Sequence, residues 1–270
     1  MSSDSPVSTH IFSQYNLSEV LESVTIHSMK DTHDAALAIK QLGDECSFKI
    51  ALCDDISSRD PLVDEEGTVL SADVFGWVVD GERWWENHNL ALDSPIVRAC
   101  RYEGEPFWCN KDGFYGHGDN PYIEEIELKT YYEETASSRS AILIPIHLPF
   151  GQISANSLHP LDETKEDLSE EYEYYADFFS LVFRRFMSGY IAAIRKTRRI
   201  PSDLVLSKRE VRCLQWAAIG KTDREIAQII NLSHATVRYH IHRAGAKLDS
   251  VNRAQTIFKA GQLGFLGASD

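Results

Sequence analysis

The sequence predicts an α+β protein with two parts. The first is an N-terminal α-β-α sandwich with an antiparallel sheet of about five strands, and the second is an all-α, four-helix helix-turn-helix domain. Up to about residue 194, short apolar runs typical of strands mix with helical apolar spacing, and only helical spacing follows. Basic and acidic residues are also distributed unevenly between the two parts. Residues 184–270 hold 16 Lys and Arg against 6 Asp and Glu, whereas residues 1–183 hold 11 against 35.

Each element of the N-terminal part is predicted from its apolar spacing and from turn residues at its ends. In chain order we expect helices at 12–25 and 32–43, a strand at 48–53, a loop at 54–70, a strand within 71–80, helices at 82–92 and 94–102, an extended piece at 104–108, a loop at 110–121, a helix at 122–136, a hairpin of 141–148 with 152–158, and a long helix from 164 to about 195. Asp54 and Asp55 after an apolar strand suggest a phospho-receiver domain. The repeating βα pattern that such a domain needs is absent from the residues that follow.

Two start signals open the C-terminal part. Ser207-x-x-Glu210 and Thr222-x-x-Glu225 each have the form of a capping box, in which the two side chains satisfy each other's free backbone N–H groups. Gly220 stands where the first of these helices is expected to end. The residues expected to face inward on the two helices are Val211, Leu214, Ala217, Ala218, Ile226, Ile229 and Ile230.

A third helix is expected to begin after Ser233, its N-cap. Its buried stripe is formed by Val237, Ile241, Ala244 and Leu248. A last helix is expected from 252 to 264, with Ile257, Phe258 and Leu263 supporting the pairing of two such domains.

The other side of the third helix is rich in cationic and polar side chains. It carries His234, Thr236, Arg238, Tyr239, His242, Arg243 and Lys247. A helix fits the major groove of B-DNA, where side chains read base edges and flanking cations hold phosphates. An isolated helix of this kind is more often a solvated surface, but two capped helices at the right spacing before it favour DNA recognition. We expect Arg238, Tyr239 and His242 nearest the bases, and Lys221, Thr222, Arg243 and Lys247 nearest the phosphates.

The segment from Leu206 to Leu266 resembles the C-terminal DNA-binding domain of LuxR-type regulators. The resemblance rests on Leu206-Ser207-x-Arg209-Glu210, Leu214, Gly220-Lys221-Thr222, Glu225-Ile226-Ala227, Leu232-Ser233, Thr236-Val237-Arg238-x-His240, Lys247-Leu248 and Asn252-Arg253. It implies a homodimeric transcription regulator that binds double-stranded DNA at an inverted repeat, with RNA polymerase as a further partner to consider. We therefore expect a disordered tail at 1–11, a ligand-sensing sandwich at 12–194, a linker at 195–203 and a LuxR-type helix-turn-helix domain at 204–270.

Four of the five tryptophans lie between Trp77 and Trp108. A packed aromatic core is one interpretation. The region also resembles the autoinducer-binding domain of LuxR-type quorum-sensing regulators, because Asp93 and Trp108 have the separation of that family's Asp and second Trp. The resemblance implies an acyl-homoserine lactone as ligand. Trp108 would donate to the lactone carbonyl, Asp93 would accept the amide N–H, Trp85 would wall the ring, and Ser157 would direct its hydroxyl toward the acyl carbonyl.

The sequence departs from that family pattern at three points. Asn89 stands where the family has Tyr. The interval from Trp85 to Asp93 is several residues shorter than in the family, and Ser94 separates Asp93 from Pro95. Ala141 stands where the family has Gly. These departures keep two alternatives open: an orphan LuxR-type regulator that responds to another small molecule, and a ligand-independent regulator controlled by a protein partner.

Several classes of protein are disfavoured by the sequence. No run of eighteen apolar residues and no secretory signal occur, so we expect a cytoplasmic protein. The five scattered cysteines form no C-x-x-C and no zinc motif, which favours free thiols, with redox sensing at Cys109 as the alternative. No Gly-x-Ser-x-Gly, P-loop or H-E-x-x-H motif occurs, so we expect no enzyme, no catalytic residues, no metal and no cofactor.

Overall fold

The computed structural model describes residues 15–58, 60–77, 94–194 and 205–267, which form two compact units. The first unit contains an antiparallel five-stranded sheet with strand order β1-β5-β4-β2-β3. Its strands are β1 (Phe48–Cys53), β2 (Phe107–Asn110), β3 (Gly113–Gly116), β4 (Ser140–His147) and β5 (Ile153–Pro160). Its helices are α2 (Leu17–Ser23), η1 (Met29–Asp31), α3 (Thr32–Glu45), α4 (Leu70–Asp73), α6 (Pro95–Ala99), α7 (Pro121–Glu124), α8 (Lys129–Glu134) and α9 (Ser169–Ile194), and the short 3-10 turn η2 (Pro149–Gly151) connects β4 to β5.

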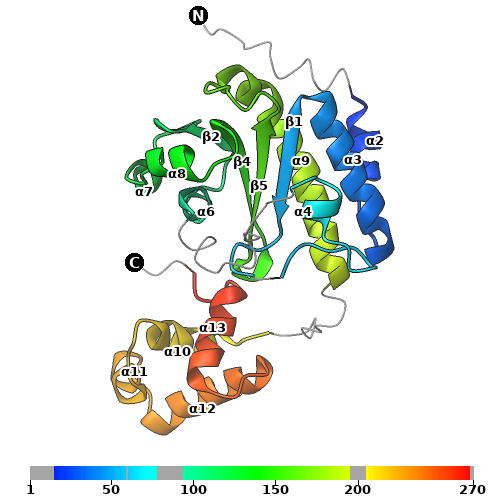
Figure 1. Cartoon of the computed structure of the whole chain (residues 1–270). Helices are drawn as coiled ribbons and strands as arrows, with labels where there is room; N and C mark the ends of the chain where they lie inside the picture. The colour runs from blue at the N-terminus through cyan, green and yellow to red at the C-terminus, as the bar shows by residue number, and fades with distance from the viewer. Residues whose placement is uncertain (1–14, 59, 78–93, 195–204, 268–270) are drawn as a thin grey trace, which may run out of the picture. The chain divides into compact units, whose positions relative to one another are not determined.

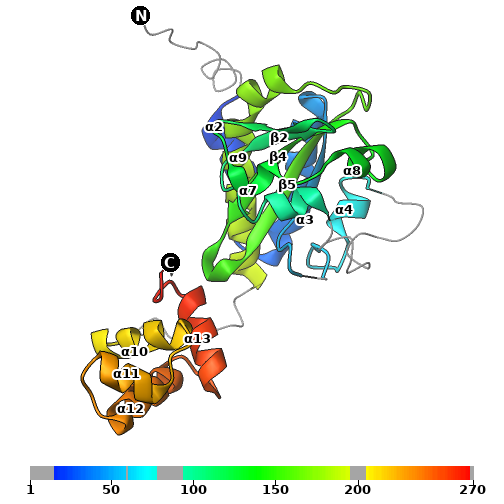
Figure 2. The same cartoon turned by 90° about the vertical axis from the view of Figure 1, so that its left-hand side faces the viewer.

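Helices cover both faces of this sheet, as Figures 1 and 2 show. On one face, α9 and α3 pack on side chains that alternate along the strands, including Ile50, Ile142 and Leu158. On the other face, α6, α7 and the segment before α8 pack around Phe107 and Leu143. The predicted α-β-α sandwich with an antiparallel five-stranded sheet is therefore confirmed.

The long helix α9 supplies most of the bulk of the larger core. Fully buried aromatic side chains recur along it at helical spacing, and they include Phe178, Phe179, Phe183, Phe186 and Tyr190. At Gly189, α9 packs tightly against the Ile26 backbone, since a Cβ at this position would meet the Ile26 carbonyl oxygen at 2.6 Å. A side chain here would push α9 away from the segment that follows α2.

Several predictions for the first unit are wrong in detail. Residues 71–77 form no strand, because the Val74 and Phe75 N–H groups bond back to the Leu70 carbonyl in a turn that continues α4. The expected loop at 110–121 contains strand β3, which a two-residue turn joins to β2. The long final helix begins at Ser169 rather than near 164, after the Asp167 carboxylate accepts the Ser169 N–H.

The predicted acidic helix at 122–136 is divided into α7 and α8. The chain buries Ile123, Ile126 and Leu128 in the same small core. A continuous helix would turn Leu128 about 200° away from Ile126, at 100° per residue. Breaking the helix lets all three side chains reach the sheet.

The second unit consists of helices, namely α10 (Lys208–Ala218), α11 (Asp223–Ile229), α12 (His234–Lys247) and α13 (Arg253–Gln262). The predicted four-helix helix-turn-helix is confirmed. Two predicted inward residues are not inside: Ala218 is exposed and Ile229 is 42% exposed. Cys213 and Ala227 are buried instead. Across the described parts of both units, no helix is long and apolar enough to cross a membrane.

Candidate DNA-binding and ligand-binding sites

Both predicted capping boxes are present and fix the starts of α10 and α11. The Ser207 hydroxyl accepts the Glu210 N–H at 3.3 Å, and Glu210 Oε2 accepts the Ser207 N–H at 2.6 Å. The Thr222 hydroxyl accepts the Glu225 N–H at 3.4 Å, and Glu225 Oε2 accepts the Thr222 N–H at 2.7 Å. Gly220, between these helices, has a φ of +91°, which favours glycine.

The third helix of the unit, α12, is held in one rotation by its cap and its buried stripe. Ser233 Oγ accepts the Thr236 N–H at 3.0 Å, as an N-cap should. The stripe predicted to be buried is confirmed, because Val237, Ile241, Ala244 and Leu248 are all buried. The opposite side of α12 is therefore directed away from the core.

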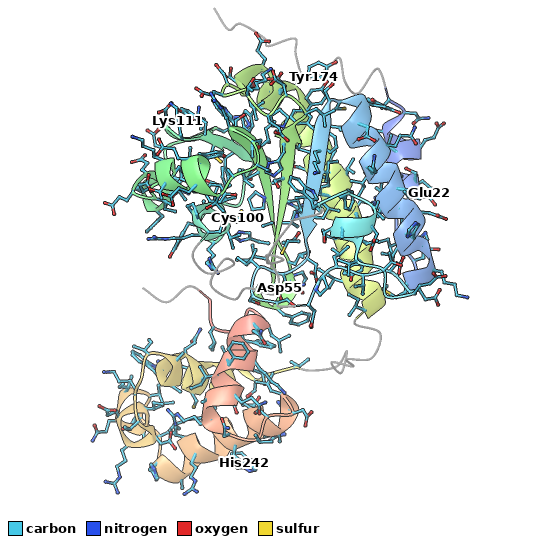
Figure 3. All side chains as sticks on the ribbon, in the orientation of Figure 1. Glu22, Asp55, Cys100, Lys111, Tyr174 and His242 are labelled. Carbon is cyan, nitrogen blue, oxygen red and sulfur yellow. The ribbon has the colours of Figure 1, made fainter. Side chains whose placement is uncertain are left out.

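That opposite side presents a row of cationic and aromatic side chains. His234, Arg238, Tyr239, His242 and Arg243 are exposed, and Figure 3 shows His242 at the surface of α12. Arg243 Nη1 donates to the Tyr239 hydroxyl at 3.1 Å, so these two side chains are ordered before any ligand binds. Tyr239 itself is 55% exposed. The arrangement offers hydrogen-bond donors and a ring on one accessible helix face.

Besides Tyr239 and Arg243, three more polar side chains predicted to contact DNA already have protein partners. The Lys247 ammonium donates to Glu210 Oε2 at 2.7 Å and to the Val205 carbonyl at 2.9 Å. The Thr222 hydroxyl donates to Glu225 Oε2 at 2.7 Å. The Thr236 hydroxyl lies 2.8 Å from Ser233 Oγ. These contacts order the domain, so each of the three groups must share or exchange its present partner to reach a phosphate.

Lys221 borders a shallow depression beside the start of α11. The Arg253 guanidinium contacts Asp223 and donates to the Lys221 carbonyl at 2.7 Å, which fixes the loop before α11. Arg224 and His234 line the same depression, and both are exposed. Sequence reasoning missed Arg224, although its position within the second capping box, three residues after Lys221, was a usable signal.

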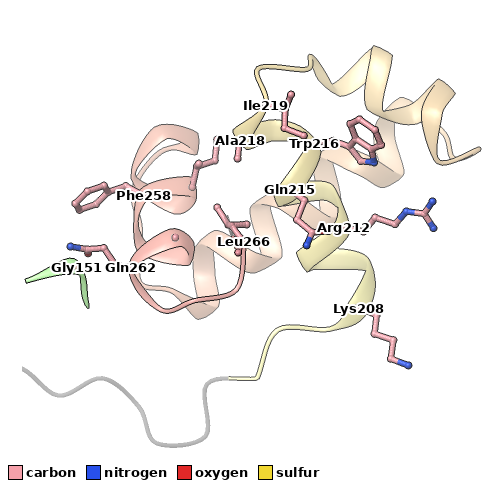
Figure 4. Close-up of a pocket in the computed structure, with 13 residues that line it drawn as sticks. Gly151, Lys208, Arg212, Gln215, Trp216, Ala218, Ile219, Phe258, Gln262 and Leu266 are labelled. Atoms are coloured by element: carbon pink, nitrogen blue, oxygen red, sulfur yellow. The ribbon is translucent and has the colours of Figure 1, made fainter. Parts of the chain in front are cut away.

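Another hollow lies between α10 and α13. Trp216 and Gln215 of α10 line it together with Phe258 of α13 and Leu266 (Figure 4). Phe258 is 64% exposed, although it is a large apolar side chain. The other two residues expected to support pairing, Ile257 and Leu263, are half-buried against the core of the unit.

The strand register of the first unit separates the predicted ligand-binding residues. Trp108 pairs with Ile142 and lies with it in the core beneath α9. Ala141 belongs to the core on the other face, and Ser157 lies on that face too, directly opposite Leu143. Trp108 is therefore not brought together with Ala141 and Ser157. Trp85, Asn89 and Asp93 lie outside the described residues.

Trp108 has the surroundings of a packed core residue. It is 8% exposed, and its ring stacks on Tyr115 with 4.2 Å between centroids. Trp77 lies near the other face, where its edge contacts the His159 ring at 5.0 Å between centroids. Trp77 Nε1 donates to the Ile50 carbonyl at 2.6 Å.

The β5 face that carries Ser157 contains a polar cluster that sequence reasoning missed. His159 lies between two hydroxyls, with its Nε2 2.9 Å from Ser157 Oγ and its Nδ1 3.0 Å from Ser138 Oγ. Burial, and secondarily the nearby Lys49 charge, lowers the pKa of His159 to about 4. The spacing Ser157-x-His159 on a strand was the available signal, since residues two apart share a face.

The cysteines are free thiols, and Cys109 does not have the environment of a redox sensor. Its side chain is fully buried, and burial raises the pKa of the Cys109 thiol to about 12. The sulfur lies 3.1 Å from the Tyr132 hydroxyl. Because the thiolate is the reactive form, this thiol is inert at neutral pH. Among the described residues no cluster of His, Cys, Asp or Glu is arranged to hold a metal ion.

Known proteins are similar to this chain in sequence and in fold. A family model described as "Bacterial regulatory proteins, luxR family" matches residues 204–260. The transcriptional activator AhyR of Aeromonas hydrophila is 30% identical over 197 residues, which is 70% of each chain. The chain belongs to the LuxR family of bacterial regulatory proteins. It is thus a transcriptional regulator with a DNA-binding helix-turn-helix, and not an enzyme.

Two further similarities extend over most of the chain. RpaR of Rhodopseudomonas palustris, a quorum sensing-dependent transcriptional regulator, is 44% identical over 196 residues, covering 71% of this chain and 73% of RpaR. The crystal structure of Escherichia coli SdiA matches 95% of this chain and all of that chain with a TM-score of 0.50 and 15% identity. The similarity to SdiA supports the LuxR-type fold of both units.

Proposed function

We propose that this LuxR-family regulator is a homodimer that binds an inverted-repeat operator and changes its occupancy in response to a small molecule. The observation that carries the DNA-binding part is the geometry of α12. Its stripe of Val237, Ile241, Ala244 and Leu248 is buried, and this directs Arg238, Tyr239 and His242 to solvent on one face. Such a face can enter the major groove, where Arg and His donors meet base-edge acceptors.

The assignment of contacts follows exposure and existing partners. Arg238, Tyr239 and His242 are the candidates for base edges. Lys221, Arg243 and His234 are the candidates for phosphates, and Arg224 joins them because it lines the same depression as Lys221. Thr222, Thr236 and Lys247 also remain proposed DNA contacts. Their hydroxyl or ammonium groups must share or exchange their present partners to bind DNA.

A homodimer is favoured by the apolar side chain that α13 leaves exposed. Phe258 borders the hollow between α10 and α13, and a second copy would remove it from water. Two domains related by a twofold axis place two α12 helices in successive major grooves. The operator should then be an inverted repeat.

The small molecule we propose is an acyl-homoserine lactone. This rests on family membership and on the quorum-sensing relative RpaR. Within the described residues, the β5 face around Ser157 is the better candidate for its floor, because Trp108 is packed beneath α9. Trp85, Asn89 and Asp93 remain proposed contacts, as does Ala141 on the neighbouring strand. Melting temperatures measured with a panel of these lactones test the assignment, and no rise with any of them would contradict it.

To test the DNA-binding part, an operator is first selected from random duplexes with the wild-type protein. Two protein variants are then compared for their affinity to this operator and to unrelated DNA. Arg238→Ala should weaken operator binding about 5- to 150-fold, with a smaller effect on unrelated DNA, because a base contact carries specificity. Lys221→Ala should weaken both DNAs alike and reduce the salt dependence. If Arg238→Ala leaves operator affinity unchanged across salt concentrations, α12 is not the reader.

A further inference from the structure

In one side-chain cluster of the first unit, the donor and the acceptor of each hydrogen bond follow from the atoms involved. It consists of Ser138, His159 and Ser157, and it lies on the sheet face opposite α9. Ser138 Oγ lies 2.9 Å from the Ser140 carbonyl oxygen and 3.0 Å from His159 Nδ1. Ser157 Oγ lies 2.9 Å from His159 Nε2.

The direction of the first bonds follows from the Ser140 carbonyl, which can only accept. The single hydrogen of the Ser138 hydroxyl is therefore given to Ser140. Toward His159, Ser138 Oγ has only lone pairs to offer, so the ring must donate from Nδ1.

The tautomer of the His159 ring then determines the direction of the hydrogen bond made by the Ser157 hydroxyl. His159 is neutral at physiological pH, since burial and the Lys49 charge lower its pKa to about 4. A neutral imidazole with its hydrogen on Nδ1 has an acceptor at Nε2. The Ser157 hydroxyl must donate its hydrogen to that acceptor, and its remaining capacity is two lone pairs.

Ser157 lies on the sheet face that we propose for the signal. It is half-buried, and Ala51 of β1 and Leu143 of β4 lie directly opposite it in the sheet. Ala155, two residues earlier on the same face, is also small. Trp77 packs edge-on against the His159 ring and supports it from another side.

We infer that Ser157 is a hydrogen-bond acceptor toward the ligand, so the acyl group of the signal carries a hydroxyl or N–H donor at this point. The inference rests on the proposed function, because it assumes that the signal binds on this face. A ketone or ether oxygen in the same place would face another acceptor with no hydrogen between them. Leaving such a pair unsatisfied should weaken binding about 5- to 100-fold.

The tautomer is tested first, on the full-length protein without ligand. Histidine ring nitrogens are correlated with ring protons in a long-range ¹H–¹⁵N spectrum, and the His159 signals are assigned with His159→Phe. We expect the pattern of a neutral ring with hydrogen on Nδ1. Hydrogen on Nε2, or a protonated ring at pH 7, would overturn the inference without touching the proposed function.

The ligand class is tested with matched pairs of decanoyl-homoserine lactones that carry either a hydroxyl or a ketone at an early, middle or late carbon. The last substituted position is the penultimate carbon of the chain, since a carbonyl on the terminal carbon would be an aldehyde and not a ketone. Dissociation constants are measured for the wild-type protein and for Ser157→Ala. At one position the alcohol should bind more tightly than the ketone to the wild type, and Ser157→Ala should lose this preference. His159→Phe frees the Ser157 hydrogen and should weaken or reverse the preference.

The outcomes separate the two proposals. Lactones that bind with the ketone preferred at every position, or an alcohol preference that survives Ser157→Ala, would overturn the inference alone. If no lactone binds, the proposed signal is wrong and the inference falls with it.

Discussion

The Lys247 ammonium, near the end of α12, lies 2.7 Å from the buried Glu210 carboxylate of α10, which also caps the backbone at Ser207. Glu210 is 1% exposed, and Arg243 Nε lies 3.7 Å from its other oxygen. Burial raises the pKa of Glu210, but hydrogen bonds from Lys247 and Ser207 outweigh it and hold the pKa below its ordinary value. One carboxylate thus links the first capping box to α12.

This link predicts a large effect on stability from one substitution. Lys247→Met leaves a buried carboxylate without its closest cation, and it should lower the free energy of unfolding of the helix-turn-helix domain by about 2–4 kcal/mol. Lys208→Met is the matched control, because Lys208 is exposed, and it should change stability by less than about 0.5 kcal/mol. Urea denaturation measures both. Equal stability of the two variants would show that the pair is not important.

The contact between Tyr239 and Arg243 predicts a variant that affects DNA binding alone. Tyr239→Phe removes the hydroxyl that accepts from Arg243 Nη1, so the guanidinium loses its orientation. Operator affinity, measured by fluorescence anisotropy, should fall about 2- to 10-fold. The melting temperature should not change, because both side chains are exposed. Tyr122→Phe, at an exposed tyrosine of the other unit, should change neither quantity.

The exposed ring of Phe258 predicts a defect in pairing. Phe258→Asp should raise the dissociation constant of the homodimer in analytical ultracentrifugation by at least about tenfold, because burying a carboxylate in an apolar contact is costly. Ile229→Asp introduces the same charge at an exposed isoleucine of α11 and serves as the control. A dimer unaffected by Phe258→Asp would place the contact between copies elsewhere.

The lowered pKa of His159 predicts a pH dependence of stability. In the unfolded chain the ring has its ordinary pKa of about 6.5, and in the folded protein it has a pKa of about 4. Between these values the unfolded state binds more protons, so this contribution is present above pH 6.5 and is lost as pH falls toward 4. The wild type should lose more stability than His159→Gln between pH 7 and pH 4.5, measured by urea denaturation. Parallel curves for the two proteins would contradict this account.

Local signals explain which parts of the fold were predictable. The two capping boxes, Ser207 to Glu210 and Thr222 to Glu225, involve residues three apart, so the sequence alone determines them. The four-residue stripe of α12 is equally local. Strand β3 was missed because its two terminal glycines are typical of a loop, and its pairing with β2 is seen only once the sheet is formed.

The positions of the proposed ligand-binding residues depend on contacts between distant parts of the chain, which local sequence patterns do not show. Whether Trp108 and Ser157 share a face follows from the register of β2 on β4 and of β4 on β5. A shift of one residue in either register would move the side chain to the other face of the sheet. The partners of Lys247 were equally hidden, because Glu210 is 37 residues away in the chain. Sequence patterns identified the family of the DNA reader, whereas tertiary contacts decide which of its polar groups are available.

In the function that we propose, two α12 helices read an inverted repeat under the control of a small signal. The most direct measurement is selection of bound duplexes from a random pool by the full-length protein, with and without acyl-homoserine lactones, followed by sequencing. We predict that the bound pool converges on two inverted half-sites about one or two helical turns apart, and that enrichment changes with a lactone. Convergence on a single unrepeated site, or identical enrichment with and without every lactone, would contradict the account.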